Sequence, residues 1–195
     1  MKYLRYFISV FLLSILALQA FFFLQILAWR WVNPPITAFQ LAERHRLCGW
    51  SIPYIHSCEI KQEWIEFKKI SPYLKRAITI SEDSDFYRHA GFEPQAMKDA
   101  WDRNQKNSKH LRGGSTITQQ LAKNLFLSGE KNYVRKVQEL AITAMLEIAL
   151  PKNRIFEIYL NSVEWGEGVF GIAAASQHYF SIKPNQLSME EAASL

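Results

Sequence analysis

The sequence predicts a mainly α-helical protein, built from one apolar helix near the N-terminus and one helical domain after it. The first observation is a run from Phe7 to Trp29 that contains no charged residue. The second is that apolar residues recur at helical spacing in several later segments, whereas the alternation typical of strands is almost absent. At 195 residues, the chain has room for one domain and a tail.

The uncharged run is long enough to cross a membrane, since about twenty apolar residues span the hydrocarbon core as a helix. Lys2 and Arg5 precede it, and this charge favours a cytoplasmic N-terminus. A cleaved signal peptide is the competing interpretation, but its apolar region would span only about 7–15 residues. The run closes with an aromatic pair, Trp29 and Trp31, as in an interfacial belt. We therefore predict a cytoplasmic stub and uncleaved anchor in residues 1–31.

The net charge of the domain limits the kinds of molecule that it is expected to bind, and the two cysteines allow more than one redox state. Two of the 23 basic residues precede the anchor, which leaves 21 basic and 18 acidic residues after it. This mild excess suits a domain resting on anionic lipid head groups, whereas nucleic acid would require a clustered basic stripe. Cys48 and Cys58 could form a disulfide outside the cytoplasm or remain thiols, because nothing in the sequence fixes their geometry.

Breaks in the helical pattern divide the rest of the chain. Asn33-Pro34-Pro35 ends the apolar helix, and residues 32–70 are expected to be a juxtamembrane linker with short helical pieces. The domain is predicted over residues 71–195, and its last helix stops at Leu195 after under three turns, which predicts a C-terminally incomplete domain. Its helices are expected at residues 72–82, 94–104, 115–127, 133–150, 152–161 and 172–180 and after Ser188.

Three local patterns add detail to this scheme. Thr116 and Gln119 have capping-box spacing, and Ser188 and Glu191 repeat it near the end of the chain. The segment V-E-W-G-E-G-V-F-G, residues 163–171, is expected to be a loop. Two apolar helix faces are predicted, one of Ile117, Leu121 and Leu125 and the other of Val134, Val137, Ala141, Met145 and Ile148.

The acidic segment Ile80–Gly91, I-S-E-D-S-D-F-Y-R-H-A-G, is the first candidate site. It sets three acids beside an aromatic pair. A carboxylate beside aromatic rings can be partly desolvated, and desolvation raises its pKa toward that of a working base. An acidic turn with Gly91 at the bend explains the same residues. The segment alone therefore assigns no function.

Two further segments gather cations and amides. Gly113-Gly114 opens onto a helix N-terminus that carries hydroxyls, a geometry that can bind an anion. Gln120 and Lys123 are three residues apart with Gln119 adjoining, so they are expected to share a polar face. Arg135 and Glu139 lie one turn apart, and such a pair is usually a surface ion pair of small energetic value. Solvated helix faces explain each feature taken singly.

Taken in order, four motifs resemble those of the peptidoglycan glycosyltransferases, glycosyltransferase family 51. The segment E-D-S-D-F-Y-R-H-A-G (82–91) matches E-D-x-x-F-x-x-H-x-G, and G-G-S-T-I-T-Q-Q (113–120) matches at every position. R-K-V-Q-E (135–139) matches R-K-x-x-E, and K-N-R-I-F-E-I-Y-L-N (152–161) matches K-x-x-I-L-E-x-Y-L-N with Phe156 for leucine. The resemblance covers roughly residues 70–195. With an anchor and no room for a transpeptidase domain, the chain resembles a monofunctional member.

The resemblance implies a lysozyme-like, all-helical fold and polymerisation of lipid II into glycan strands. The product strand grows by inverting transfer to the GlcNAc 4-hydroxyl, with release of undecaprenyl diphosphate, in cell wall biosynthesis. The enzyme would work on the outer face of the plasma (inner) membrane, so the catalytic domain would be extracytoplasmic, or periplasmic. The implied partners are lipid II, the growing glycan strand, the membrane and other cell-wall synthesis proteins.

The chemistry needs a base for the acceptor hydroxyl and positive charge for the leaving diphosphate. By the motif match, Glu82 is the base, supported by Asp83, with His89 as a tempting alternative that we interpret as structural. Glu139 is the second catalytic carboxylate and could hold a divalent cation, Mg²⁺ or Mn²⁺, although no cofactor is certain. The expected substrate-binding residues besides Asp83 are Ser115, Gln119, Gln120, Lys123, Lys131, Arg135 and Lys136.

Two other functions remain open, and so does the way the domain meets the membrane. A lysozyme-like peptidoglycan-cleaving enzyme would use two carboxylates flanking a glycosidic bond and has less need for clustered cations. An inactive membrane-anchored scaffold would not need the two glutamates. Because a lipid-linked substrate enters from the bilayer, Phe92, Met97 and Trp101 are candidates for an apolar membrane surface, with core packing as the alternative.

Overall fold

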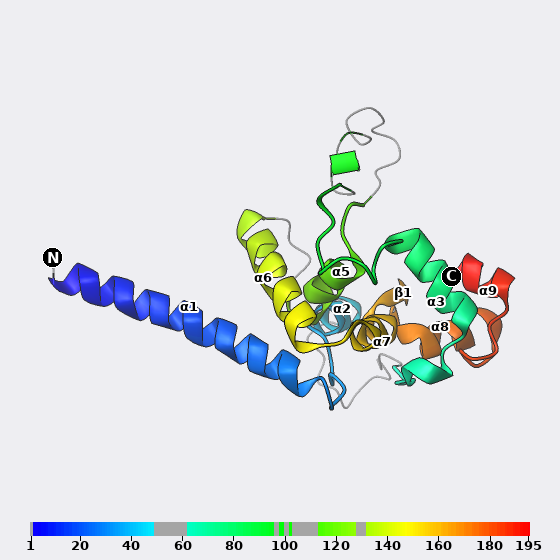
Figure 1. The fold of residues 1–195 in the computed structure, drawn as a ribbon. Helices are drawn as coiled ribbons and strands as arrows, with labels where there is room; N and C mark the ends of the chain where they lie inside the picture. The colour runs from blue at the N-terminus through cyan, green and yellow to red at the C-terminus, as the bar shows by residue number, and fades with distance from the viewer. Residues whose placement is uncertain (1, 49–61, 96–97, 100–101, 103–112, 128–131) are drawn as a thin grey trace.

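A computed structural model describes residues 2–48, 62–95, 98–99, 102, 113–127 and 132–195 (Figure 1). This part of the chain is mainly helical, as predicted. In chain order, the elements are α1 (Lys2–Ala28), α2 (Ala38–Cys48), a 3₁₀ turn (Phe67–Lys69), α3 (Pro72–Glu82), α5 (Ile117–Phe126), α6 (Tyr133–Ala149), α7 (Lys152–Ser162), β1 (Glu164–Gly166), β2 (Val169–Phe170), α8 (Gly171–Phe180) and α9 (Met189–Ser194).

Helix α1 extends from the helical body as a separate rod (Figure 1). Its apolar window has a mean hydropathy of 2.5 and no buried residue, so α1 is long and apolar enough to cross a membrane. Only its C-terminal end packs on the domain, through buried Ile26. Trp29, just beyond, stacks on Phe126 at 5.1 Å between ring centroids. Trp29 is therefore a core residue, and its assignment to an interfacial belt was wrong.

The segment expected to be a linker contains helix α2, which packs against α5. Thr37 and Gln40 fix its start through two reciprocal bonds between side chain and backbone, of 2.8 and 3.0 Å, and both residues are buried. Such capping satisfies backbone donors that the first helical turn leaves without partners. Residues 38–48 thus add a packed helix to the domain.

Helix α5 lies at the centre of the core, packed against both α6 and α7. Its predicted stripe of Ile117, Leu121 and Leu125 is buried. The predicted capping box is also present, with Thr116 and Gln119 each bonding the backbone of the other. Helix α7 is buried on several sides, because it sits between α5 and α8. These contacts fix the two helices that carry the second and fourth motifs.

Of the predicted apolar face of α6, Met145 packs against the core and Ala141 is half-buried, but the rest lies outside it. Val134, Val137 and Ile148 are 81%, 67% and 75% exposed. The buried face instead contains Glu139 together with Ile142, Thr143, Leu146 and Ala149. Helix α6 is apolar on both faces, and periodicity cannot decide which of the two is inside. The inner face is the one on which the buried Glu139 carboxylate has ion-pair partners, Arg135 and Lys136.

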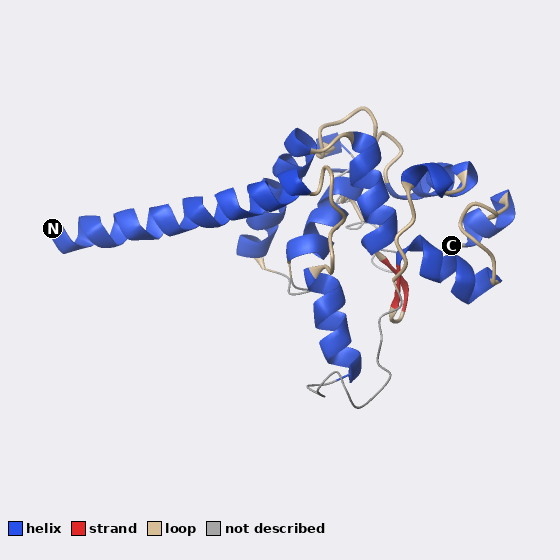
Figure 2. Ribbon diagram, turned by 90° about the horizontal axis from the view of Figure 1, so that it is seen from below, coloured by secondary structure: helices blue, strands red, loops and turns tan. Residues whose placement is uncertain are grey.

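A small antiparallel hairpin replaces the loop predicted at residues 163–171. Strand β1 pairs with β2, with Glu164 opposite Phe170 and Gly166 opposite Val169 (Figure 2). These strands are too short for side-chain alternation to be detected in the sequence. Gly171 follows with φ at +76°, and a Cβ there would lie 2.6 Å from the carbonyl oxygen of Asn161. Glycine therefore permits both the backbone conformation and the close approach to α7.

The C-terminal segment packs against the start of α3. The Ser71 hydroxyl donates to the Leu187 carbonyl at 3.0 Å, and the Ser71 N–H donates to the Pro184 carbonyl at 3.1 Å. Ser71 precedes Pro72 as predicted, but its hydroxyl makes this tertiary contact and does not cap α3. The predicted capping box of Ser188 and Glu191 is present at the start of α9.

Candidate active site

A pocket of about 580 Å³ collects groups from elements that are far apart in the chain. Glu82, the last residue of α3, lines it together with Gln120 and Lys123 of α5. Tyr159 of α7, the β1 strand and the C-terminal residues Ala193 and Leu195 complete the wall. Three residues predicted to belong to the site, Glu82, Gln120 and Lys123, therefore share one pocket.

A chain of hydrogen bonds orients the Glu82 carboxylate. The Tyr159 hydroxyl donates to Gln120 Oε1 at 3.1 Å, and Gln120 Nε2 donates to Glu82 Oε2 at 2.8 Å. Gln120 Nε2 also lies 3.5 Å from the Ser115 carbonyl oxygen, so two acceptors face the NH₂ end of the amide. Glu82 itself is exposed, not enclosed by aromatic rings as the sequence suggested. One oxygen is held and the other can meet a substrate proton.

Tyr159 is the site residue that the sequence analysis missed. It is buried, and burial raises the pKa of its phenol well above the usual range, with further upward contributions from the charges of Glu82 and Asp83. The phenol therefore stays protonated and available as a donor to Gln120. Its signal was present in the sequence, since Tyr159 is the tyrosine of the fourth motif.

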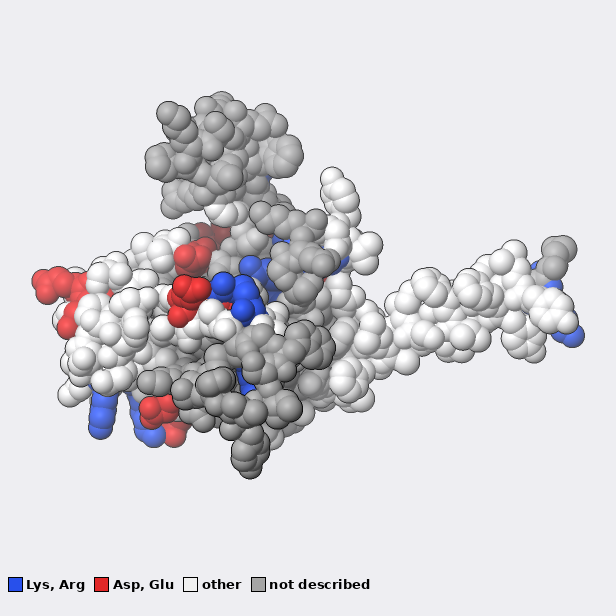
Figure 3. All heavy atoms as spheres, turned by 180° about the vertical axis from the view of Figure 1, so that it is seen from behind, with Lys and Arg blue, Asp and Glu red and all other residues white. Residues whose placement is uncertain are grey.

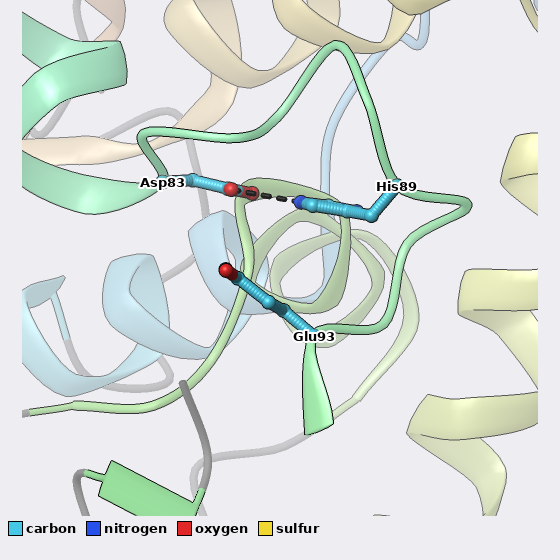
Figure 4. Close-up of side chains that lie close together, drawn as sticks. All are labelled: Asp83, His89 and Glu93. Carbon is cyan, nitrogen blue, oxygen red and sulfur yellow. Dashed lines mark hydrogen bonds and ion pairs between the residues drawn. The ribbon is translucent and has the colours of Figure 1, made fainter. Parts of the chain in front are cut away.

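Asp83 joins the first motif to the start of α5. Its Oδ1 lies 2.8 Å from His89 Nε2 (Figure 4). Its Oδ2 accepts the Ile117 N–H at 3.0 Å. The Asp83 side chain is fully buried. Asp83 is thus positioned to support Glu82 indirectly, by fixing the end of α3 relative to α5. The same contact, together with the bond from the Gly91 N–H to His89 Nδ1, holds His89 between Asp83 and the turn of the first motif.

Gly91 lets the first motif pack tightly against α6. Its φ is +84°, and a Cβ there would lie 2.7 Å from the Thr143 methyl carbon. The Gly91 carbonyl accepts the Thr116 hydroxyl at 2.7 Å, which ties this turn to the N-cap of α5. Any larger residue would push the turn away from both helices. The glycine of the first motif is explained by this close approach.

A second charged cluster lies on the inner face of α6. Arg135 Nη1 lies 2.8 Å from Glu139 Oε2, and Lys136 Nζ lies 2.5 Å from Glu139 Oε1. The Glu139 side chain is only 4% exposed, so this is not the weak surface pair that the spacing suggested. Two cations around one carboxylate leave a net positive charge. Lys136 is partly exposed, which leaves that charge accessible.

The chain was compared with known proteins. Residues 52–195, most of the chain, match the family model described as Transglycosylase. The chain belongs to the transglycosylase family. It is 56% identical over its whole length to a biosynthetic peptidoglycan transglycosylase of Cupriavidus metallidurans, covering 82% of that relative. The corresponding proteins of Cupriavidus pinatubonensis and Ralstonia nicotianae are 54% and 53% identical, also over the whole chain, which covers 76% and 82% of them.

This membership confirms the predicted enzyme class, so the protein is a peptidoglycan glycosyltransferase, a transferase of peptidoglycan synthesis. The match includes α3, α5, α6 and α7, the elements that build both charged clusters. The family also accounts for the order of the four motifs. Their three-dimensional arrangement is what the structure adds.

The remaining predicted site residues occupy different environments. Gln119 is buried in the capping box of α5, so it does not share the exposed polar face predicted for Gln120 and Lys123. Ser115 is half-buried just before α5. Lys123 has no ion-pair partner among the described residues and borders the same pocket as Glu82. Lys131 lies outside the described residues, as do Met97 and Trp101.

Asp83, His89 and Glu93 could bind a metal by proximity alone, since one ligand atom from each lies within 4.8 Å of the others (Figure 4). His89 Nδ1 accepts the Gly91 N–H at 3.0 Å, so in the neutral ring the proton sits on Nε2, which faces Asp83. Neither nitrogen then keeps a lone pair for a metal. The cluster is a hydrogen-bond network that does not fit an ion.

The divalent cation suggested at Glu139 fits no better. Both Glu139 oxygens are already engaged by Arg135 and Lys136. A metal ion would have to displace one of these cations and sit beside the other, which like-charge repulsion opposes. The reaction proposed for this protein therefore relies on its own side chains and not on a metal ion.

Proposed function

We propose that the enzyme polymerises lipid II into glycan strands by inverting transfer to the GlcNAc 4-hydroxyl, with release of undecaprenyl diphosphate. The observation that carries the proposal is the Glu82 carboxylate, held by Gln120 at one oxygen in a pocket that also contains Lys123. A base and a cation in one pocket suit a reaction in which a hydroxyl loses a proton while a diphosphate leaves.

Glu82 is the proposed general base. The acceptor hydroxyl approaches its Oε1, and the proton passes to this oxygen as the hydroxyl oxygen forms its bond to the anomeric carbon. Gln120 Nε2 holds Oε2 at 2.8 Å, so the carboxylate does not need to reorient during the transfer. A base positioned in this way contributes about 10²–10⁴-fold to the rate.

The leaving diphosphate is the proposed partner of the cations. Lys123 projects into the pocket from α5, while Arg135 and Lys136 stand on α6, which packs against α5. Glu139 orients both of the α6 cations and is in this proposal a holder of charge, not a proton carrier. Ser115 precedes the N-terminus of α5, where backbone N–H groups also favour an anion.

We also propose where the protein lies. Residues 1–31 form the cytoplasmic stub and anchor, residues 32–70 a juxtamembrane segment whose helix α2 packs on the domain, and residues 71–195 the glycosyltransferase domain. The domain lies on the periplasmic face of the inner membrane, because the positive charges at the tip of α1 favour a cytoplasmic N-terminus (Figure 3). Lipid II and the growing glycan strand are then reached from the bilayer, beside other cell-wall synthesis proteins.

A peptidoglycan-cleaving activity receives less support from the pocket. Glu164 is a second carboxylate in the wall, but its Oε1 accepts the Gly168 N–H at 3.0 Å and stabilises the hairpin. A hydrolase needs two carboxylates that both work on the glycosidic bond. Glu164→Gln should therefore leave the transfer reaction within a few-fold of wild type.

The test is incubation of purified protein with labelled lipid II and gel analysis of the products. Glu82→Gln should lower the rate of strand formation by about 10²–10⁴-fold, while circular dichroism shows an intact fold. Asp85→Asn is the matched control, since Asp85 lies three residues away and its ion-pair partner among the described residues is exposed Arg88, at 3.1 Å. Strand formation by Glu82→Gln at a rate within a few-fold of Asp85→Asn would remove Glu82 from the role of base.

A further inference from the structure

The outward side of α6 is apolar along its whole length. Its members are Tyr133, Val134, Val137, Leu140, Ala141, Ala144, Met145 and Ile148, here called the α6 outer face. Tyr133 is 94% exposed, and Val134, Val137 and Ile148 are also exposed. The charged residues of α6 lie on other sides of the helix, where they form ion pairs or hydrogen bonds within the domain. A helix in water normally shows the reverse pattern.

The anchor helix runs beside this face. Gln19 and Gln138 exchange two side-chain bonds of 2.9 and 3.2 Å, and Arg30 Nη1 lies 3.5 Å from the Ala149 carbonyl oxygen. Both contacts join residues 119 positions apart, so residues 19–30 run in the same direction as residues 138–149 of α6. The apolar residues Val134, Ala141 and Met145 lie one or two helical turns from Gln138 on that side of α6, Val134 exposed and the other two half-buried.

The length of α1 determines how deep this contact lies. The part before Gln19, from Lys2 to Leu18, is about 25 Å long at about 1.5 Å per residue. The hydrocarbon core of a bilayer is about 30 Å thick. A span by α1 therefore needs residues beyond Gln19, and those residues lie alongside α6. Figure 3 shows α1 as an uncharged rod that ends in a charged tip. Because no charge interrupts the rod, the part of α1 beyond Gln19 can also lie in the hydrocarbon core.

We propose that the α6 outer face is a second membrane-contacting surface, which inserts into the head-group and acyl boundary of the outer leaflet beside α1. Burying these side chains in lipid is favourable, because it removes apolar surface from water. The occupant is lipid because the face is continuous with the uncovered apolar surface of α1. A contiguous exposed apolar patch of this kind marks an interaction site.

This surface differs from the one that the sequence suggested. Phe92 is half-buried, and the other two candidates lie outside the described residues. The inference does not depend on the proposed reaction. If that reaction is correct, however, α6 would present Arg135 and Lys136 on its domain side at the level of the lipid head groups, where a lipid-linked diphosphate lies.

Photocrosslinking tests the proposal in the full chain, reconstituted into vesicles of phosphatidylethanolamine and phosphatidylglycerol. A benzophenone amino acid replaces Val137 or Ile148, both already exposed, so that the fold is not disturbed. Leu16 of α1 is the positive control, and Met189 of α9, which is 66% exposed at the far end of the domain, is the matched negative control. Mass spectrometry and gels then identify the adducts.

We expect lipid adducts at Val137 and Ile148 in amounts similar to Leu16 and several-fold above Met189. Three results would overturn the proposal. These are a covalent dimer in place of the lipid adduct, adducts at Val137 and Ile148 no greater than at Met189, and failure of Leu16 itself to reach lipid, because the argument requires α1 in the bilayer. Polymerising activity of these variants does not enter the comparison, so the proposal and the reaction fail separately.

Discussion

Two glutamates that come from different motifs meet opposite environments in this enzyme. Glu82 is exposed at the end of α3 and receives one hydrogen bond, from Gln120 at 2.8 Å. Glu139 is buried on α6, with both oxygens engaged by Arg135 and Lys136. A carboxylate with an open oxygen can accept a proton, whereas one enclosed by cations holds its charge and fixes the cations. In the proposed reaction, Glu82 is therefore the group that reacts and Glu139 the group that organises charge.

Removing the Glu139 charge should have the largest effect on folding. Glu139→Gln leaves Arg135 and Lys136 near each other without their shared counter-ion. Breaking a buried ion pair from one side typically costs about 3–5 kcal/mol. We expect urea denaturation to show a loss of this size, with loss of polymerisation. Glu82→Gln is the control, since an exposed carboxylate should change the free energy of unfolding by within about 0.5 kcal/mol.

Equal stability of the Glu139→Gln and Glu82→Gln proteins would contradict this contrast. It would mean that the two α6 cations find other partners, or that the cluster opens to water. Replacing Glu139 by aspartate sharpens the test. The shorter side chain keeps the charge but cannot reach both cations, so an intermediate loss of stability is expected.

Lys123→Ala should have the second-largest effect, on binding and not on folding. Lys123 lines the Glu82 pocket and has no ion-pair partner among the described residues. A charged hydrogen bond to a phosphate is worth about 1.5–3 kcal/mol. We expect binding of a diphosphate-containing inhibitor, measured by calorimetry, to weaken by about tenfold or more.

Lys183→Ala is the control for that measurement, since Lys183 is an exposed lysine outside the pocket. Arg135→Ala should weaken the same binding and also destabilise the fold, because it removes one of the two partners of Glu139. If Lys123→Ala binds the inhibitor as wild type does, Lys123 does not belong to an anionic subsite.

Much of the architecture could be predicted because it depends on local signals. The cap of α5, its stripe of Ile117, Leu121 and Leu125, and the limits of α3 are all encoded within a few residues. The failures lie where the sequence is compatible with two arrangements. Helix α6 has two apolar faces, and only its packing against α1 and α5 decides which one is outside. The hairpin of β1 and β2 is too short to leave a pattern.

The sequence predicted residues of the candidate site but not the contacts that connect them. The motif match identified Glu82 and Gln120, and helix spacing added Lys123; the fold brings all three to one pocket. The motif match could not separate Gln120, which faces the pocket, from its neighbour Gln119, which caps α5 as its spacing predicted. Nor could it foresee the partner of Gln120, since Tyr159 lies 39 residues away and meets Gln120 only through the packing of α7 on α5.

The smallest expected effect concerns that partner. Tyr159→Phe keeps the buried ring and removes only the hydroxyl, which donates to Gln120 Oε1 at 3.1 Å. Gln120 then loses one of the contacts that direct its NH₂ group toward Glu82. A hydrogen bond of this kind is worth about 0.5–1.5 kcal/mol, which corresponds to about a 2–12-fold fall in kcat. KM should change little, because Tyr159 acts on the base through Gln120 and not on the substrate.

Activity measured on fully folded protein distinguishes this positioning role from a loss of stability. If Tyr159 acts through Gln120 on the Glu82 carboxylate, kcat of Tyr159→Phe should fall at a temperature where circular dichroism shows the protein fully folded. Tyr179→Phe is the matched control, because that hydroxyl donates to the Trp165 carbonyl at 3.1 Å at an exposed position. If both variants lower kcat equally, or if kcat falls only together with the folded fraction, Tyr159 contributes only packing.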